Sequence, residues 1–87
     1  MKTREGFVLR EIGGNHVVVA VGEAVKNFKS IINLNGTGAF LWKKLEIGAT
    51  EEELVKDIIS EYQVEEEVAK KDVSAFIQRL KENGLVE

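Results

Sequence analysis

Two segments in the first quarter of the chain read as strands: the first alternates in part between apolar and polar residues, and the second is rich in β-branched residues. They are residues 7–13 (FVLREIG) and 16–22 (HVVVAVG), and they flank a Gly-Gly-Asn sequence. β-Branched residues favour strands, and glycine and asparagine accept the positive φ angles of a tight turn. The pattern therefore predicts an antiparallel hairpin.

A third short strand is predicted at residues 30–34 (SIINL), after a turn within GEAVKNFK. Successive side chains of a strand point to opposite faces. The alternation places Ser30, Ile32 and Leu34 on one face of this strand. Ile31 and Asn33 then lie on the other face.

Beyond residue 35 the apolar positions recur every three or four residues, which is the period of a helix. Three helices are predicted, at about residues 36–46, 50–62 and 65–83. Apolar side chains mark their buried faces: Gly38, Leu41, Trp42 and Leu45 in the first, Leu54, Ile58, Ile59 and Tyr62 in the second, and Ala69, Val73, Phe76, Ile77 and Leu80 in the third. Strands followed by helices predict an α+β fold. We expect residues 1–87 to form one small winged helix-turn-helix-like domain, with a three-stranded antiparallel sheet followed by three helices.

The predicted helices carry recognisable end signals. Asn35 or Thr37 can cap the first helix, because a side-chain oxygen there can accept a bond from a free backbone N–H. Thr50 and Glu53 have the spacing of a capping box. An Asn-Gly pair at residues 83–84 is a typical helix stop.

Composition excludes several classes of protein. The 87 residues are 44% hydrophobic and 31% charged, which is typical of a globular domain. The absence of cysteine excludes disulfides, thiolate metal sites and iron–sulfur clusters. No apolar run approaches the roughly 18 residues of a membrane span, and the first residues lack the apolar stretch of a secretory signal. These features predict a cytoplasmic protein.

The charge is unevenly distributed, and this bears on nucleic-acid binding. Residues 46–87 hold twelve Asp and Glu against five Lys and Arg. The predicted third helix carries four basic and five acidic residues, so it would repel phosphates more than attract them. A winged-helix DNA-binding regulator is the alternative that the helical topology suggests, and the charges count against it.

The stretch LNGTGAFLW at residues 34–42 raises the question of a phosphate-binding loop. It lacks the Lys-Ser or Lys-Thr pair with which a P-loop handles phosphate and magnesium, so it is interpreted as a strand-to-helix junction. His16 is the only histidine, whereas a catalytic zinc usually takes three protein ligands. No serine or threonine has a histidine base at a recognisable spacing. The sequence predicts no catalytic set, no metal site and no cofactor.

The third strand and the third helix together suggest a binding surface. A short edge strand exposes backbone N–H and C=O groups, which are a template for an extended peptide. The helix has a second side that carries Asp72 and Arg79 near Phe76. Alternatively, these charges are simply solvated and a partner subunit covers the edge. The residue pattern alone leaves both interpretations open.

Five ordered segments resemble the PqqD family. They are FVLRE, VVVAVGE, LNGTGAFLW, ATEEELVKDIISEY and KKDVSAFIQRLKENGLV. In that family a Leu-Asn-x-Thr-Gly-Ala segment precedes a Trp-containing helix, and an Asp-Val-x-x-Phe helix with a terminal Gly-Leu follows later. The similar segments run from Phe7 to Val86.

The resemblance implies a non-enzymatic peptide-binding adaptor, also called a precursor-peptide recognition element. Such domains bind the leader of a ribosomally made precursor peptide as a strand added to the third strand. They present it to a modifying enzyme, often a radical S-adenosylmethionine enzyme, as in pyrroloquinoline quinone (PQQ) biosynthesis or a related peptide pathway. Members also occur as homodimers, so the oligomeric state is left open.

The resemblance also implies a set of peptide-binding residues on the third strand and the third helix. An apolar pocket between Ile31, Phe76 and Leu80 would select apolar leader residues. Lys29 or Arg79 would suit an acidic leader residue, and Asp72 would disfavour one. The full set is Lys29, Ser30, Ile31, Ile32, Asn33, Leu34, Asp72, Val73, Phe76, Ile77, Arg79 and Leu80.

Overall fold

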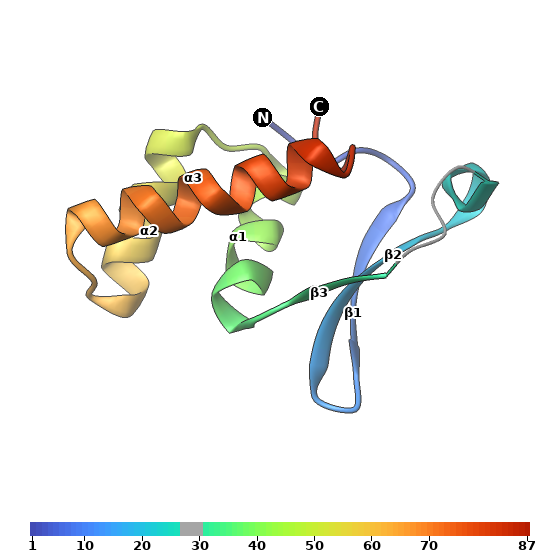
Figure 1. Cartoon of the computed structure of the whole chain (residues 1–87), viewed down its shortest axis with the longest axis horizontal. Coiled ribbons are helices and arrows are strands. Elements are labelled where there is room, and N and C mark those ends of the chain that lie inside the picture. Colours follow the sequence, from blue (N-terminus) through green and yellow to red (C-terminus); the bar gives the residue numbers. More distant parts are fainter. Residues whose placement is uncertain (27–30) are drawn as a thin grey trace.

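The computed structural model describes residues 1–26 and 31–87, and these form a small sheet and a group of helices. In Figure 1 the α-helices lie together on one side and the strands on the other, and β3 leads from the sheet into α1. The elements are β1 (Phe7–Ile12), β2 (Asn15–Ala20), the 3₁₀ helix η1 (Gly22–Lys26), β3 (Ile32–Leu34), α1 (Gly36–Ile47), α2 (Glu51–Tyr62) and α3 (Glu66–Glu82). The order of strands and helices matches the predicted α+β fold.

The β1–β2 hairpin forms as predicted, with a tighter turn than Gly-Gly-Asn implied. Gly13 and Gly14 alone make the turn, at φ 57° and 84°. Both values lie in the region that glycine reaches without steric cost. Asn15 already belongs to β2, where it pairs with Ile12.

The third strand is shorter than predicted. It begins at Ile32, so Ile31 lies outside the strand, and Ser30 lies outside the described residues. The predicted alternation is confirmed within the strand. Ile32 and Leu34 are buried, whereas Asn33 is exposed.

The strand order β1-β2-β3 makes β3 an edge strand. In an antiparallel pair, residues alternately direct both backbone polar groups at the partner and both away from it. The N–H of Val21 donates to the carbonyl of Gly6 at 2.7 Å, so the in-phase residue Val17 also directs its groups toward β1. Asn33 pairs with Val17. Asn33 therefore directs its N–H and C=O away from β2, toward the free edge of the sheet.

The helix caps agree with the sequence signals. Asn35 is the N-cap of α1, and its Oδ1 accepts a bond from the N–H of Gly38 at 2.7 Å. Such a cap contributes about 1 kcal/mol. Thr50 and Glu53 form both bonds of a capping box. At the end of α3, Gly84 has a φ of 69°, which stops the helix.

The capping box makes the stability of the folded protein depend on pH. The N–H and hydroxyl of Thr50 lower the pKa of Glu53 below its ordinary value of 4.5. A lowered folded-state pKa means that this stabilisation is complete above pH 4.5 and is lost as pH falls through the folded-state pKa. Unfolding experiments between pH 7 and pH 3 should show a flatter acid dependence for Glu53→Gln than for the wild type. Identical profiles would show that Glu53 plays no such role.

One cluster of buried side chains joins the sheet to all three helices. The largest fully buried members are Trp42, Leu41, Leu45, Leu54, Ile58, Leu80, Leu85, Val18 and Val73. The predicted stripe of α1 is confirmed, but Tyr62 of α2 is 43% exposed and was wrongly assigned to the buried side. The Tyr62 ring packs edge-to-face on Phe40, with the two ring centroids 5.6 Å apart. Val55 is buried on α2 instead.

The two ends of the chain bind each other. Thr3 forms a β-bridge with Val86, and the N–H of Glu87 donates to the carbonyl of Lys2 at 2.9 Å. Leu85 and Val86 are buried, so the C-terminal residues complete the core. We call these pairings of residues 2–4 with residues 85–87 the terminal clasp.

Candidate functional site

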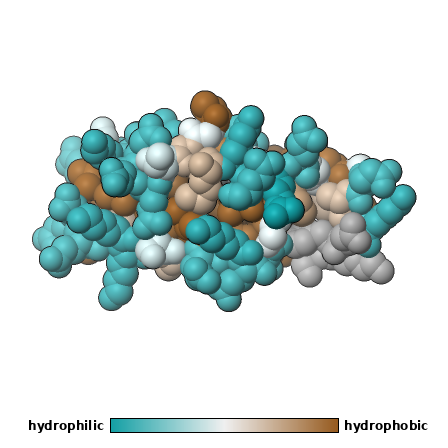
Figure 2. Space-filling view, turned by 90° about the horizontal axis from the view of Figure 1, so that it is seen from above, coloured by the Kyte–Doolittle hydropathy of each residue, from teal (hydrophilic) through white to brown (hydrophobic). Residues whose placement is uncertain are grey.

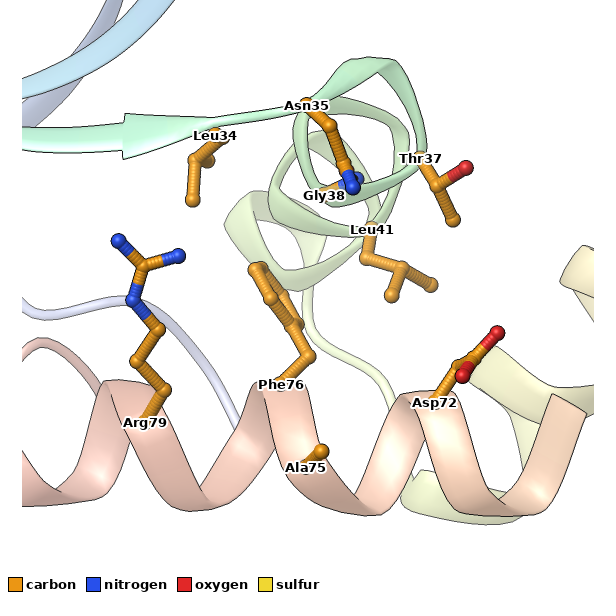
Figure 3. A pocket seen from close by; sticks show the side chains of 9 residues that line it. All are labelled: Leu34, Asn35, Thr37, Gly38, Leu41, Asp72, Ala75, Phe76 and Arg79. Carbon is orange, nitrogen blue, oxygen red and sulfur yellow. The ribbon is translucent and has the colours of Figure 1, made fainter.

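A groove lies between the end of β3, the first turns of α1 and one side of α3. Its volume is about 360 Å³. Figure 3 shows that α3 forms one wall, and that the junction between β3 and α1 forms the other. The lining residues are Leu34, Asn35, Thr37, Gly38, Leu41, Asp72, Ala75, Phe76 and Arg79.

The depth of the groove depends on Gly38. A Cβ atom at this position would lie 3.2 Å from Oδ1 of Asn35 and 3.3 Å from both Leu34 and Phe76. The half-buried Phe76 ring therefore packs directly against the α1 backbone. The interpretation of LNGTGAFLW as a junction is consistent with this packing, in which glycine allows close approach.

Opposite charges stand at the two ends of the α3 wall. Asp72 and Arg79 are exposed and seven positions apart, which corresponds to about 10 Å along a helix. In Figure 3 both side chains rise from α3 toward the opposite wall, with Phe76 between them. The groove is thus apolar in its middle and polar at both ends.

Arg79 also contacts the edge strand directly. Its Nη2 donates a hydrogen bond to the carbonyl oxygen of Asn33 at 3.0 Å. This is the carbonyl that the strand register directs toward the free edge. The guanidinium therefore links α3 to β3 at the place where a further strand would pair.

The predicted site residues fall into five groups. Leu34, Asp72, Phe76 and Arg79 line the groove, and Asn33 lies on the free edge. Ile31 is 58% exposed and precedes the strand. Lys29 and Ser30 lie outside the described residues. The remaining four belong to the buried core: Ile32, Val73, Ile77 and Leu80.

The burial of Leu80 bears on the apolar pocket expected between Ile31, Phe76 and Leu80. Leu80 is fully buried in the core and does not line the groove. The apolar part of the groove is formed instead by Phe76 with Leu34 and Leu41.

Sequence reasoning missed the contribution of α1 to the site. Asn35, Thr37, Gly38 and Leu41 line the groove from this side. They were interpreted only as cap and core. The signal that could have revealed them is Gly38, because a glycine on the buried stripe of a helix indicates that another element comes close.

The described residues show no candidate metal site. None of them forms a group of three or more His, Asp or Glu side chains that could hold a metal ion. His16 is half-buried, and its Nδ1 lies 4.0 Å from the carboxylate of Glu11. Within the same part of the chain, no helix is both long and apolar enough to cross a membrane.

The face of the molecule seen in Figure 2 is mostly hydrophilic. Figure 2 shows charged and polar side chains over much of one face, with apolar side chains between them. Large exposed apolar residues are found on several different elements: Ile12, Val21, Val25, Ile31, Ile47, Tyr62 and Val68. The groove beside β3 is therefore the site where an open strand edge, an apolar wall and charged groups meet.

A small domain with an open strand edge beside a helix-walled groove is built to accept an extended chain. A family model described as "Coenzyme PQQ synthesis protein D (PqqD)" matches residues 15–86. The chain therefore belongs to the PqqD family, and the resemblance found in the sequence is confirmed. The family model begins at β2, later than the resemblance at Phe7. No curated protein matches the chain.

Two solved structures are similar over almost the whole chain. One is TbiB1 in complex with the TbiA(beta) leader peptide, which is 26% identical, with a TM-score of 0.79 over 100% of this chain and 95% of that chain. The other is a lasso peptide synthetase B1 complexed with the leader peptide. It is also 26% identical, with a TM-score of 0.75 over 97% of this chain and 93% of that chain. Both confirm the predicted fold class.

Proposed function

We propose that this protein binds the leader segment of a ribosomally made precursor peptide as an added strand on β3. The observation that carries this proposal is the free edge at Asn33, which lies directly beside the groove between β3, α1 and α3. The two similar structures support it, because each of those proteins is bound to a leader peptide.

The geometry divides the recognition between backbone and side chains. The N–H of Asn33 points to the free edge, where it can donate to a carbonyl of the incoming strand. Such backbone bonds demand little of the peptide sequence. Alternate side chains of the added strand would face the groove, where Phe76 offers an apolar contact. An apolar leader residue at this position is the expected specificity element.

We further propose that the protein performs no chemistry itself and delivers the bound leader to a modifying enzyme. Peptide-modifying enzymes of the radical S-adenosylmethionine class are the expected partners in this family. The groove is complete within one chain, so the proposed binding requires no second copy.

A titration of the ¹⁵N-labelled full chain tests the proposal. Synthetic leader segments of the short peptides encoded beside the gene are added, with a scrambled peptide of equal composition as control. We expect saturable binding, with amide shifts at β3 and along the Asp72–Arg79 side of α3. Because a disordered leader loses entropy on binding, a Kd of the order of micromolar is expected.

Two results would contradict the proposal. Equal shifts with the leader and the scrambled peptide would show that no specific site exists. Tight, salt-sensitive binding of duplex DNA would favour the winged-helix regulator instead.

A further inference from the structure

The free edge of β3 is already partly occupied in the folded chain. Asn33 offers two backbone groups to an incoming strand, its N–H and its C=O. The C=O accepts a bond from Nη2 of Arg79 at 3.0 Å. An incoming strand would donate its own N–H to this same carbonyl. Arg79 therefore occupies the position that a peptide donor needs.

This contact is of a kind that a ligand can displace. The Arg79 side chain is exposed, and its bond to Asn33 spans 46 positions of sequence, so no local turn holds it. Among the described residues, no carboxylate lies within ion-pair distance of its guanidinium. Arginine binds carboxylates through two parallel bonds, which are stronger than a single bond to a neutral carbonyl. The guanidinium of Arg79 is therefore available to pair with a carboxylate of a bound peptide.

We propose that Arg79 is a latch on the peptide-binding edge, and that an acidic side chain of the leader releases it. This inference rests on the proposed function and names the leader class that the site selects. When a leader with Asp or Glu binds beside β3, Arg79 releases the carbonyl of Asn33 and forms an ion pair with the leader carboxylate. The free carbonyl then accepts a hydrogen bond from the leader backbone. When a neutral leader binds, the Arg79–Asn33 bond is broken and no ion pair replaces it.

Asp72 limits where the acidic residue can lie. It stands at the opposite end of the α3 wall, about 10 Å from Arg79 along the helix. A leader carboxylate at that end would meet like charge, so the acidic residue must lie at the β3 end. The two charges therefore define the register of the leader as well as its composition.

A binding experiment with paired peptides and paired variants tests the latch. Each leader segment of the short peptides encoded beside the gene is synthesised twice, with its acidic residues and with the matching amides. Arg79→Met keeps the aliphatic stem and removes every donor. Lys81→Met removes the same charge from an exposed position of the same helix and serves as control.

Arg79→Met is expected to change the affinities for the two peptides in opposite directions, weakening the acidic peptide and strengthening the amide peptide. Wild type and Lys81→Met should bind the acidic peptide about tenfold more tightly than the amide peptide. Arg79→Met should lose this preference and bind the amide peptide about threefold more tightly than wild type does. Equal weakening of both peptides by Arg79→Met would overturn the latch, because that is the result for a residue that only contacts the leader.

A measurement on the peptide-free protein separates the latch from the proposed function. The ¹³C carbonyl shift of Asn33 should change in Arg79→Met and stay unchanged in Lys81→Met. An unchanged shift in both variants would show that Arg79 does not cap the edge. If no peptide binds the wild type, the proposed function fails together with release by a leader. The carbonyl shift still decides whether the cap exists.

Discussion

Replacing Trp42 with alanine is expected to lower the free energy of unfolding by about 3–5 kcal/mol. Trp42 is fully buried on α1, within the cluster that joins the sheet to the helices. A domain of this length has a total stability of roughly 4–13 kcal/mol. The variant should therefore be unfolded or close to it at 37 °C. Urea denaturation followed by circular dichroism measures the difference.

Trp42→Phe provides the matched comparison. Among the described residues, the buried Nε1–H of Trp42 meets no acceptor. An unpaired buried donor costs about 1–3 kcal/mol, and phenylalanine removes it. This gain offsets part of the lost packing, so the phenylalanine variant should lose less than about 1.5 kcal/mol. A loss in Trp42→Phe well above this value would show that the unpaired indole N–H carries no such cost.

Asn33→Pro is expected to weaken leader binding by at least about tenfold. Proline removes the one N–H that Asn33 directs to the free edge, and its ring stands where the added strand must approach. Loss of a backbone bond together with this obstruction corresponds to about 1.4 kcal/mol or more. The pairing of β3 with β2 does not use this N–H, so the fold should be retained. Isothermal titration calorimetry with the leader segment that binds the wild type gives the affinity.

Asn33→Ala is the control for this substitution. It removes the exposed side chain and keeps both backbone groups, so it should bind within about twofold of wild type. Thermal unfolding of both variants establishes that they are folded. Wild-type affinity in a folded Asn33→Pro variant would show that the peptide does not pair with this edge.

Turns and helix caps are the features of this fold that can be predicted most directly from the sequence. The Gly13-Gly14 turn, the Asn35 cap and the Thr50–Glu53 capping box involve residues at most three positions apart. Their geometry follows from residue type and spacing alone. The buried stripe of α1 follows in the same way from the helical period.

The division of α3 into core and groove could not be predicted in this way. Helical period shows that Val73 and Phe76 lie near one another, but not that the element opposite Phe76 leaves space beside it. That space depends on the position of the β3–α1 junction in the folded protein. Likewise, Tyr62 fits the apolar period of α2, yet it lies at the edge of the core against Phe40. The Arg79–Asn33 bond has no local signal, because 46 positions separate its partners.

The terminal clasp has a consequence for the order of folding. The bond from Nε of Arg4 to the carbonyl of Val86 closes a loop of 82 positions. Closing such a loop costs about 2 kcal/mol more in chain entropy than closing a loop of roughly ten residues. The hairpin and the α2–α3 pair need only short loops. The two ends of the chain are therefore expected to meet after the hairpin and the helices have formed, and the burial of Leu85 and Val86 completes folding.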